Sequence, residues 1–310
     1  MKLTILGSSS ALPTSERYPS AHALNVHERL YLIDCGEGTQ LQLRRNRIRF
    51  TKINHIFITH LHGDHVFGIY GLLSTMNLMG RKIPINIYAP GNYDIILNSH
   101  LRDFDLELGF EIKYTSLKGK DPEVILDNKH LTVASFPLVH RIPSYGFLFR
   151  EKPKERNIIK ECIDKYNIPI SRIPAIKKGE DFVASDGEII KNDVLTLPPA
   201  PPVSYAYCSD TRYFSRLSSF VKGVTALYHE ATFSCEEQKL AKTTFHSTTH
   251  DAAITAKNAE AQTLIIGHFS SRYKNINQLV DEARAVFPRT FPAIDGKSYE
   301  IVADSIEKVF

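Results

Sequence analysis

The 310-residue sequence has few cysteines, no long apolar run and only a small charge imbalance. Its four cysteines are scattered and form no Cys-x-x-Cys pair, so neither a zinc knuckle nor a disulfide framework is indicated. No apolar run is long enough to span a bilayer, and the apolar part of Met1–Gly7 is too short for a signal peptide. We therefore expect free thiols, no membrane association and a cytoplasmic location.

The overall charge leaves the partner open. A net charge of +4 permits an anionic partner but is too small to indicate nucleic acid by itself. With 43% hydrophobic residues, the chain can bury a substantial core. Regular alternation of apolar strands and helical segments favours an α/β fold, and we expect one domain over residues 1–310.

The stretch Thr59–His65 holds three histidines and one aspartate in six positions. It follows an apolar, β-branched run that predicts a buried strand, so the four side chains lie on the turn at its end. His60 and His62, two residues apart, project to the same side of an extended segment. Gly63 lets the chain bend, so that Asp64 and His65 point elsewhere. This spacing predicts two half-sites for two metal ions.

A two-metal centre needs further ligands, and three other apolar runs end in a suitable residue. They are Leu131–His140, a strand ending in Asp210 and Thr263–His268. Ligands at the ends of several strands can converge at one edge of a sheet. We assign one ion to His60, His62 and His140, the other to Asp64, His65 and His268, and place Asp210 between them. Two such ions can stabilise the attacking and leaving oxygens of a phosphoryl displacement.

Glu230 and His246 form a second candidate pair. A histidine held by a carboxylate can donate a proton to a leaving oxygen. The alternative is that Glu230 is only an acid at a strand end and His246 only a loop histidine.

Residues 150–178 are charged and interrupted by prolines, with a helix expected over Asn157–Tyr166. Nine Lys and Arg stand against four Asp and Glu, so this insertion is either a surface hairpin or a basic arm for a polyanion. A helix is expected to begin after an N-cap at Thr39. Four arginines lie around its end (Arg44, Arg45, Arg47 and Arg49), and we interpret them as a solvated basic face rather than an RNA contact.

With these residues in view, the chain resembles the metallo-β-lactamase superfamily and, within it, the short form of ribonuclease Z, the tRNA 3′-processing endoribonucleases. His-x-His-x-Asp-His is common to the superfamily, whereas five further segments are narrower matches in the family's order. These are Leu6–Thr14, Pro137–Arg141, Ser209–Arg212, His229–Phe233 with His246–Thr248, and Gly267–Tyr273.

The resemblance implies a four-layer αβ/βα sandwich with an inserted basic arm, two Zn²⁺ ions and a homodimer in which one subunit's arm holds the precursor tRNA cut by the other. It implies that Asp64 is both ligand and proton acceptor, and that Glu230 and His246 assist the leaving group. Mn²⁺ or Fe²⁺ would suit the same donors. The residues then expected to contact RNA are Ser8, Ser9, Arg272, Lys152, Lys154, Arg156, Lys177 and Lys178.

Two other functions fit the sequence. One is a bimetal phosphodiesterase acting on small phosphodiesters, and the other is a non-catalytic RNA-binding subunit with a structural metal. A structural metal would be closed to further ligands, whereas seven ligands for two ions leave room for water and substrate.

Overall fold

The computed structural model describes residues 1–303 and 305–309 and divides the chain into two compact units. The first unit contains Met1–Arg150 and the chain from Val203 onward. The second unit, Glu151–Pro202, is called the arm unit below. No helix among the described residues is both long enough and apolar enough to cross a membrane.

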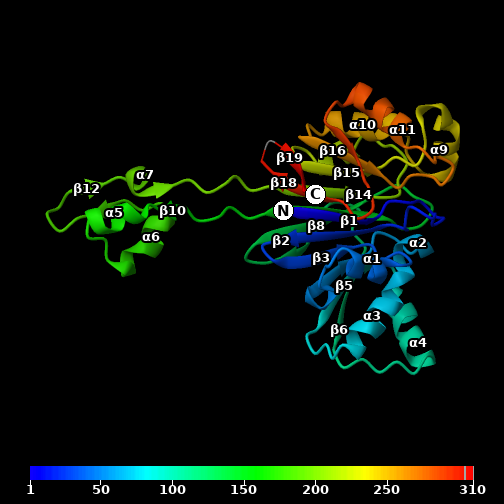
Figure 1. The fold of residues 1–310 in the computed structure, drawn as a ribbon, viewed down its shortest axis with the longest axis horizontal. Helices are drawn as coiled ribbons and strands as arrows, with labels where there is room; N and C mark the ends of the chain where they lie inside the picture. The colour runs from blue at the N-terminus through cyan, green and yellow to red at the C-terminus, as the bar shows by residue number, and fades with distance from the viewer. Residues whose placement is uncertain (304, 310) are drawn as a thin grey trace. The chain divides into compact units, whose positions relative to one another are not determined.

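The first sheet of the first unit has eight strands in the order β19-β18-β1-β2-β3-β4-β5-β6 (Figure 1). Its strands are β1 Lys2–Gly7, β2 Ala21–Val26, β3 Arg29–Ile33, β4 Ile53–Phe57, β5 Ile85–Pro90, β6 Ile112–Leu117, β18 Ser298–Val302 and β19 Ser305–Val309. The helices that accompany it are α1 Thr39–Arg45, the short 3₁₀ turn η1 Phe50–Lys52, α2 Gly63–Val66, α3 Gly68–Leu78 and α4 Tyr93–Asp103.

The second sheet has seven strands in the order β17-β16-β15-β14-β9-β8-β7. They are β7 Glu123–Asp127, β8 Leu131–Pro137, β9 Tyr145–Glu151, β14 Ser204–Cys208, β15 Ala226–Glu230, β16 Thr263–Gly267 and β17 Thr290–Pro292. The accompanying helices are α8 Leu217–Phe220, η3 Cys235–Glu237, α9 Gln238–Thr244, α10 Thr249–Asn258 and α11 Asn277–Val286. Strands β14, β15 and β16 run parallel and are buried throughout, as expected for strands covered on both faces.

Three apolar cores separate four layers, which confirms the predicted αβ/βα sandwich. On β1, alternate side chains serve different cores: Leu3 and Ile5 face the second sheet, and Leu6 faces the helices of the first. One core packs the first sheet on α1, α3 and α4, one lies between the sheets, and one packs the second sheet on α8, α10 and α11. The two sheets therefore lie face to face, with helices outside.

Strand direction decides where functional side chains gather. Strands β3 and β4 are parallel, as are β14, β15 and β16, so their carboxyl ends lie at one edge of each sheet. Asp34, His60, Asp210 and His268 follow β3, β4, β14 and β16. We call this the site edge, and the opposite edge, where β1, β3 and β4 begin, the far edge.

The arm unit has a small core of its own, formed by Ile168, Ile176, Phe182, Ile190 and Leu195. Its elements are β10 Asn157–Ile158, α5 Lys160–Lys165, η2 Ile170–Arg172, α6 Ile173–Lys177, β11 Phe182–Val183, β12 Ile189–Ile190, α7 Asn192–Leu195 and β13 Thr196–Leu197. The unit continues past residue 178, and the helix expected over Asn157–Tyr166 is shorter because Asn157 and Ile158 pair with β13.

The arm unit is electrically neutral as a whole. It contains nine Lys and Arg and nine Asp and Glu, because residues 179–202 add five acids and one lysine. Several basic side chains pair with these and other acids of the unit: Arg156 with Asp193 at 2.6 Å, Lys177 with Glu155 at 3.5 Å, Arg172 with Glu180 at 3.6 Å and Lys191 with Asp181 at 3.0 Å. The net charge of +4 therefore resides in the first unit.

Two local expectations need correction. The strand expected over Leu131–His140 ends at Pro137, which has no N–H for a ladder, so His140 lies on the following loop. Thr39 is the first helical residue of α1 rather than its N-cap, a position taken by Gly38 at φ 79°. The Thr39 hydroxyl instead donates to the Gly36 carbonyl at 2.7 Å.

Candidate metal centre and active site

One group of metal-competent side chains comes from the loop after β4 and from two other loops. His62 Nδ1 lies 3.0 Å from His60 Nε2 and 3.3 Å from His140 Nε2. Asp210 Oδ2 lies 3.5 Å from His60 Nε2 and 3.8 Å from His140 Nε2. These four donor atoms converge on one point, as a metal ion would require.

A second group lies on the other side of Asp210. Asp64 Oδ2 is 3.5 Å from His65 Nε2 and 3.6 Å from His268 Nε2. Asp210 Oδ1 is 3.4 Å from His65 Nε2 and 3.1 Å from His268 Nε2. The two oxygens of Asp210 thus face different groups, which is the arrangement of a carboxylate shared by two ions.

Hydrogen bonds to the remaining ring nitrogens orient three of the histidines. His65 Nδ1 is 2.8 Å from Asp34 Oδ2, His140 Nδ1 donates to the Phe245 carbonyl at 2.9 Å, and His268 Nδ1 is 2.9 Å from Thr232 Oγ1. Each contact holds the proton on Nδ1 and turns Nε2 toward the cluster, as outer partners of metal-bound histidines do.

Asp34 is a functional residue that was not expected from the sequence. Its carboxylate also accepts the Thr59 N–H at 2.8 Å and the Tyr207 hydroxyl at 3.1 Å, so one buried group joins β3, β4 and β14 behind the site. Asp34 has a φ of 56° and His268 a φ of 58°, so both strand ends turn sharply beside the cluster.

The electrostatics of the cluster favour a cation. Burial and the nearby His65 hold the pKa of His60 well below its usual value, which keeps that imidazole neutral. Burial would also lower the pKa of His65, but the carboxylates Asp64, Asp210 and Asp34 outweigh it and raise this pKa well above the usual value. Without a metal ion, the protonated imidazole of His65 balances part of the negative charge of the three carboxylates. A divalent cation at the cluster would balance more of this charge.

Two buried histidine nitrogen atoms also support a cation site at the cluster. Among the described residues, the buried Nε2 atoms of His65 and His268 are without a hydrogen-bond partner. Such buried groups are unfavourable unless they bind a ligand. The cluster of imidazoles and carboxylates therefore fits metal ions.

Glu230 and His246 meet as expected, at 2.9 Å between Glu230 Oε1 and His246 Nδ1. Burial would raise the pKa of Glu230, but the adjacent His246 lowers it overall. Burial would lower the pKa of His246, but Glu230 raises it to about 9. The Thr232 hydroxyl donates to Glu230 Oε2 at 2.6 Å and contacts His268, so the pair is linked to the cluster.

A cavity of about 750 Å³ opens onto the cluster. His62, Asp64, His140, His246 and His268 reach it from one side. Arg141, Arg272 and the loop Ser10–Pro13 also line it, so two cationic side chains lie at the same cavity as the metal-competent groups.

The residues expected to contact RNA are distributed over both units. The Ser8 hydroxyl is buried and donates to Asp295 Oδ1 at 2.6 Å, and the Ser9 hydroxyl donates to the Leu12 carbonyl at 2.7 Å. Arg272 lies at the cavity and pairs with Glu237 at 3.3 Å. The remaining five residues are in the arm unit: Lys152, Lys154, Arg156, Lys177 and Lys178.

The whole described fold is similar to known structures. The chain and the crystal structure of human tRNase Z, short form, align over 97% and 99% of their lengths with a TM-score of 0.70 and 26% identity. The metallo-β-lactamase fold protein YhfI from Bacillus subtilis aligns over 96% and 98% with a TM-score of 0.67 and 18% identity, and so supports the fold alone.

The sequence comparison decides the family. Ribonuclease Z from Bacteroides thetaiotaomicron is 45% identical over 289 residues, which cover 93% of this chain and 92% of that protein. The chain belongs to the ribonuclease Z family. Residues 1–155 also match a family model described as anti-Pycsar protein Apyc1, a range that includes His60–His140 but not Asp210, Glu230, His246 or His268. As a member of this family, the chain is a metal-dependent hydrolase of the endoribonuclease class.

Proposed function

We propose that the site holds two zinc ions and removes the 3′ trailer from precursor tRNA. The observation that carries this is the position of Asp210, whose two oxygens face two separate groups of donors in a ribonuclease Z chain. One ion would be held by His60, His62 and His140, the other by Asp64, His65 and His268, with Asp210 shared.

Imidazole and carboxylate donors suit zinc, although manganese and iron accept the same set. Metal analysis of the protein purified without added metal tests this assignment. Two zinc equivalents per chain support it, and one equivalent or another metal contradicts it.

When bound, the ions activate water and stabilise negative charge on the phosphate. Asp64 Oδ2 accepts the N–H of Ala11 at 2.8 Å, which fixes the carboxylate that takes up a proton from the attacking water. His246, held by Glu230, lies at the cavity and donates a proton to the departing 3′ oxygen of the tRNA. The tRNA keeps a 3′-hydroxyl and the trailer a 5′-phosphate.

Recognition of tRNA rests on its folded shape and its phosphates rather than on base sequence. Arg141 and Arg272, which line the cavity, are proposed to contact phosphates next to the cleaved bond. The arm unit is proposed to hold the body of the tRNA.

A homodimer is also proposed. Leu41 on α1 and Phe67 before α3 expose 51% and 64% of their surface, which gives the helical face of the first sheet apolar side chains for a second copy. Light scattering of the purified protein tests this, with a dimer mass expected and a monomer mass contradicting it.

The catalytic assignment predicts that chelation of the metal ions and the substitution Asp64→Ala each abolish cleavage of a trailer-bearing tRNA, because both remove groups that act on the attacking water. Cleavage is measured on a labelled precursor with and without restored zinc. His250→Ala is the matched control: His250 is an exposed histidine on α10, so this variant should keep full activity. Full activity in the chelated protein or in Asp64→Ala contradicts the mechanism.

The two rival functions are less well supported. A family relation at 45% identity favours an endoribonuclease over a small-ester phosphodiesterase. The open cavity beside the cluster argues against a closed structural metal.

A further inference from the structure

Two adjoining cavities lie at the far edge of the first unit, away from the metal cluster. They have volumes of about 370 and 340 Å³, and Leu30 and Lys52 line both. The first is also lined by Lys2, Arg47 and Arg49, and the second by Arg29 and Lys129. These positions lie at the starts of β1, β3 and β4, after α1, and in the turn before β8.

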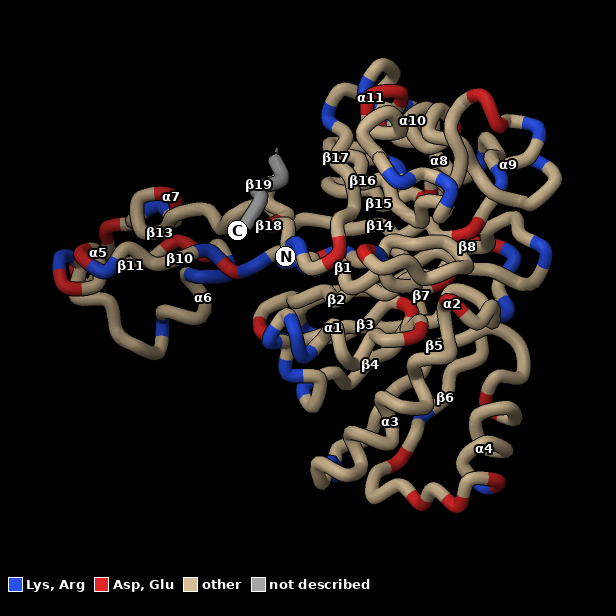
Figure 2. Tube along the Cα trace, turned by 45° about the vertical axis from the view of Figure 1, so that its right-hand side comes forward, with Lys and Arg blue, Asp and Glu red and all other residues tan. Residues whose placement is uncertain are grey.

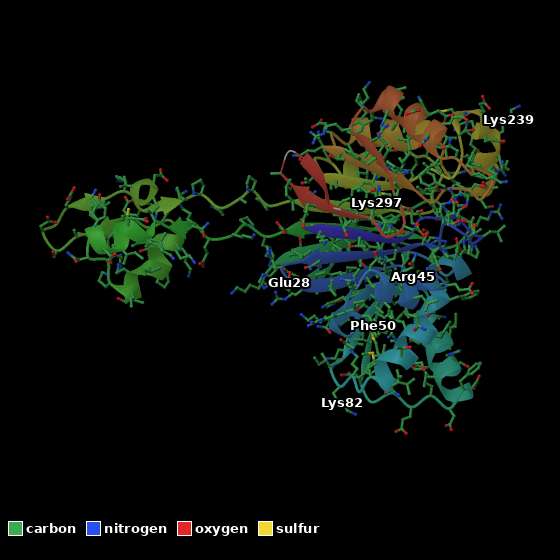
Figure 3. All side chains as sticks on the ribbon, viewed as in Figure 1. Glu28, Arg45, Phe50, Lys82, Lys239 and Lys297 are labelled. Atoms are coloured by element: carbon green, nitrogen blue, oxygen red, sulfur yellow. The ribbon has the colours of Figure 1, made fainter. Side chains whose placement is uncertain are left out.

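The lining is strongly basic. The two cavities bring together six Lys and Arg side chains (Lys2, Arg29, Arg47, Arg49, Lys52 and Lys129), and Glu28 is the acid among their lining residues. Asp127, at the end of β7, is the nearest acid along the chain to Lys129. In Figure 2 the Lys and Arg segments gather beside α1 and β2, and Figure 3 marks Glu28 in this region.

Three of these six cations form no ion pair with a described residue. In the part of the chain that the structure describes, no ion pair involves Arg47, Arg49 or Lys52, whereas Arg156, Arg172, Lys177 and Lys191 of the arm unit all pair with acids. All three side chains are exposed. Unpaired cations that surround a cavity repel one another and favour an anionic ligand.

The backbone at Arg47 adopts an unfavourable conformation beside the first cavity. Arg47 has a φ of 56°, the left-handed conformation that glycine or asparagine normally takes after a helix. The turn is fixed by the Arg47 N–H to the Arg44 carbonyl at 3.0 Å and the Ile48 N–H to the Leu43 carbonyl at 2.8 Å. An arginine in this conformation is strained, and its side chain places a positive charge at the cavity.

We propose that this surface binds the phosphate backbone of RNA, at a site separate from the metal cluster. Several cations over two adjoining cavities suit a chain of phosphates better than a single anion, and the amides of Asn25 and Asn128 add polar groups to the lining. The proposal rests on the proposed function, because the RNA is the precursor tRNA that the site cleaves. It replaces the expectation that the arginines after α1 form only a solvated face.

The test is a triple variant, Arg47→Gln, Arg49→Gln and Lys52→Gln, in the full-length zinc-loaded protein. The KM for precursor tRNA should rise about tenfold or more, and the salt dependence of binding should fall by about two in slope, because phosphate contacts are lost. The kcat for tRNA and the hydrolysis of a small chromogenic phosphodiester should be unchanged.

The matched control removes the same charge elsewhere: Lys82→Gln, Lys118→Gln and Lys257→Gln, three exposed lysines of the first unit that form no ion pair with a described residue. Figure 3 marks Lys82 after α3. An equal change of KM in the two triple variants overturns the proposal.

A second measurement needs no variant. Bound tRNA should protect Lys52 and Lys129 from acylation and leave Lys82 reactive, and equal reactivity of all three with and without tRNA overturns the proposal. If the wild-type protein cleaves no precursor tRNA, the proposed function fails. If it cleaves normally and the far edge stays unprotected, this inference alone fails.

Discussion

At the scale of single residues, the site depends on groups that touch no substrate. Asp34 binds His65 Nδ1 at 2.8 Å and is itself held by Thr59 and Tyr207. Such a carboxylate fixes the ring's tautomer and raises the affinity of Nε2 for metal. Asp34 therefore acts as a positioning residue for a proposed metal ligand.

The substitution Asp34→Asn should weaken zinc binding about 10- to 100-fold, because an amide donor cannot hold the His65 Nδ1 proton in the same way. Competition with a chromogenic chelator measures this affinity. Asp121→Asn is the control, since Asp121 is exposed and pairs only with Arg216 among the described contacts. Equal affinities of the two variants contradict the role given to Asp34.

Much of the site could be predicted at this scale because its residues share one pattern, a metal-competent side chain after an apolar strand. The pattern found His60, His140, Asp210 and His268, and the structure brings them together. Applied to the strand that ends at Asp34, the same pattern would have found that residue too. The roles of the Thr59 and Thr232 hydroxyls could not be predicted, since threonine in a strand or loop has no distinguishing signal.

At the scale of elements, close packing holds the histidine loop against β3 and α1. A Cβ added at Gly68, the first residue of α3, would lie 2.0 Å from the Gly36 carbonyl oxygen. One added at Gly36 would lie 2.3 Å from the Asp64 carbonyl oxygen. Glycine at both positions lets the backbone beside the metal ligands approach β3 closely.

Gly68→Ala should lower stability by about 1–3 kcal/mol, because the new methyl group has no space. Gly71→Ala, one turn later on α3, is the control: its Cβ would lie 3.6 Å from Gln40, and alanine favours a helix over glycine by up to about 1 kcal/mol. Thermal unfolding at equal zinc loading should therefore move in opposite directions. A loss of stability as large in Gly71→Ala as in Gly68→Ala contradicts the packing argument.

Element positions were predicted best where apolar runs are long and buried. The parallel strands β14 and β16 are buried segments that were expected from the sequence to end near Asp210 and His268. The two-residue strands of the arm unit could not be predicted, because only their partner strands define them. The strand β19 was not predicted, because Ser305–Val309 mixes polar and apolar residues over too few positions to be distinguished from an irregular chain end.

At the scale of the whole molecule, we propose that the arm unit contributes to tRNA recognition and the first unit carries out cleavage. The arm unit has its own core and a balanced charge, whereas the metal cluster and the net positive charge belong to the first unit. The proposed role of the arm in holding tRNA therefore depends on shape and a few exposed lysines rather than on overall charge.

We expect removal of the arm unit to separate cleavage of precursor tRNA from hydrolysis of a small phosphodiester. Arg150 and Ser204 are neighbours across the β9–β14 pair, so residues 151–202 can be replaced by Asn-Gly, which with Val203 closes a three-residue loop between the two strands. The variant should lose cleavage of precursor tRNA and keep hydrolysis of a small chromogenic phosphodiester. Loss of both activities with normal zinc content, or retention of both, contradicts the division.

The most direct test of the account is to map the product ends from several precursor tRNAs cut by the zinc-loaded protein. The account predicts one cut near the discriminator nucleotide, with a 3′-hydroxyl on the tRNA and a 5′-phosphate on the trailer, and no products after chelation. A 2′,3′-cyclic phosphate on the tRNA, or cleavage that persists without metal, would contradict a two-metal ribonuclease Z mechanism.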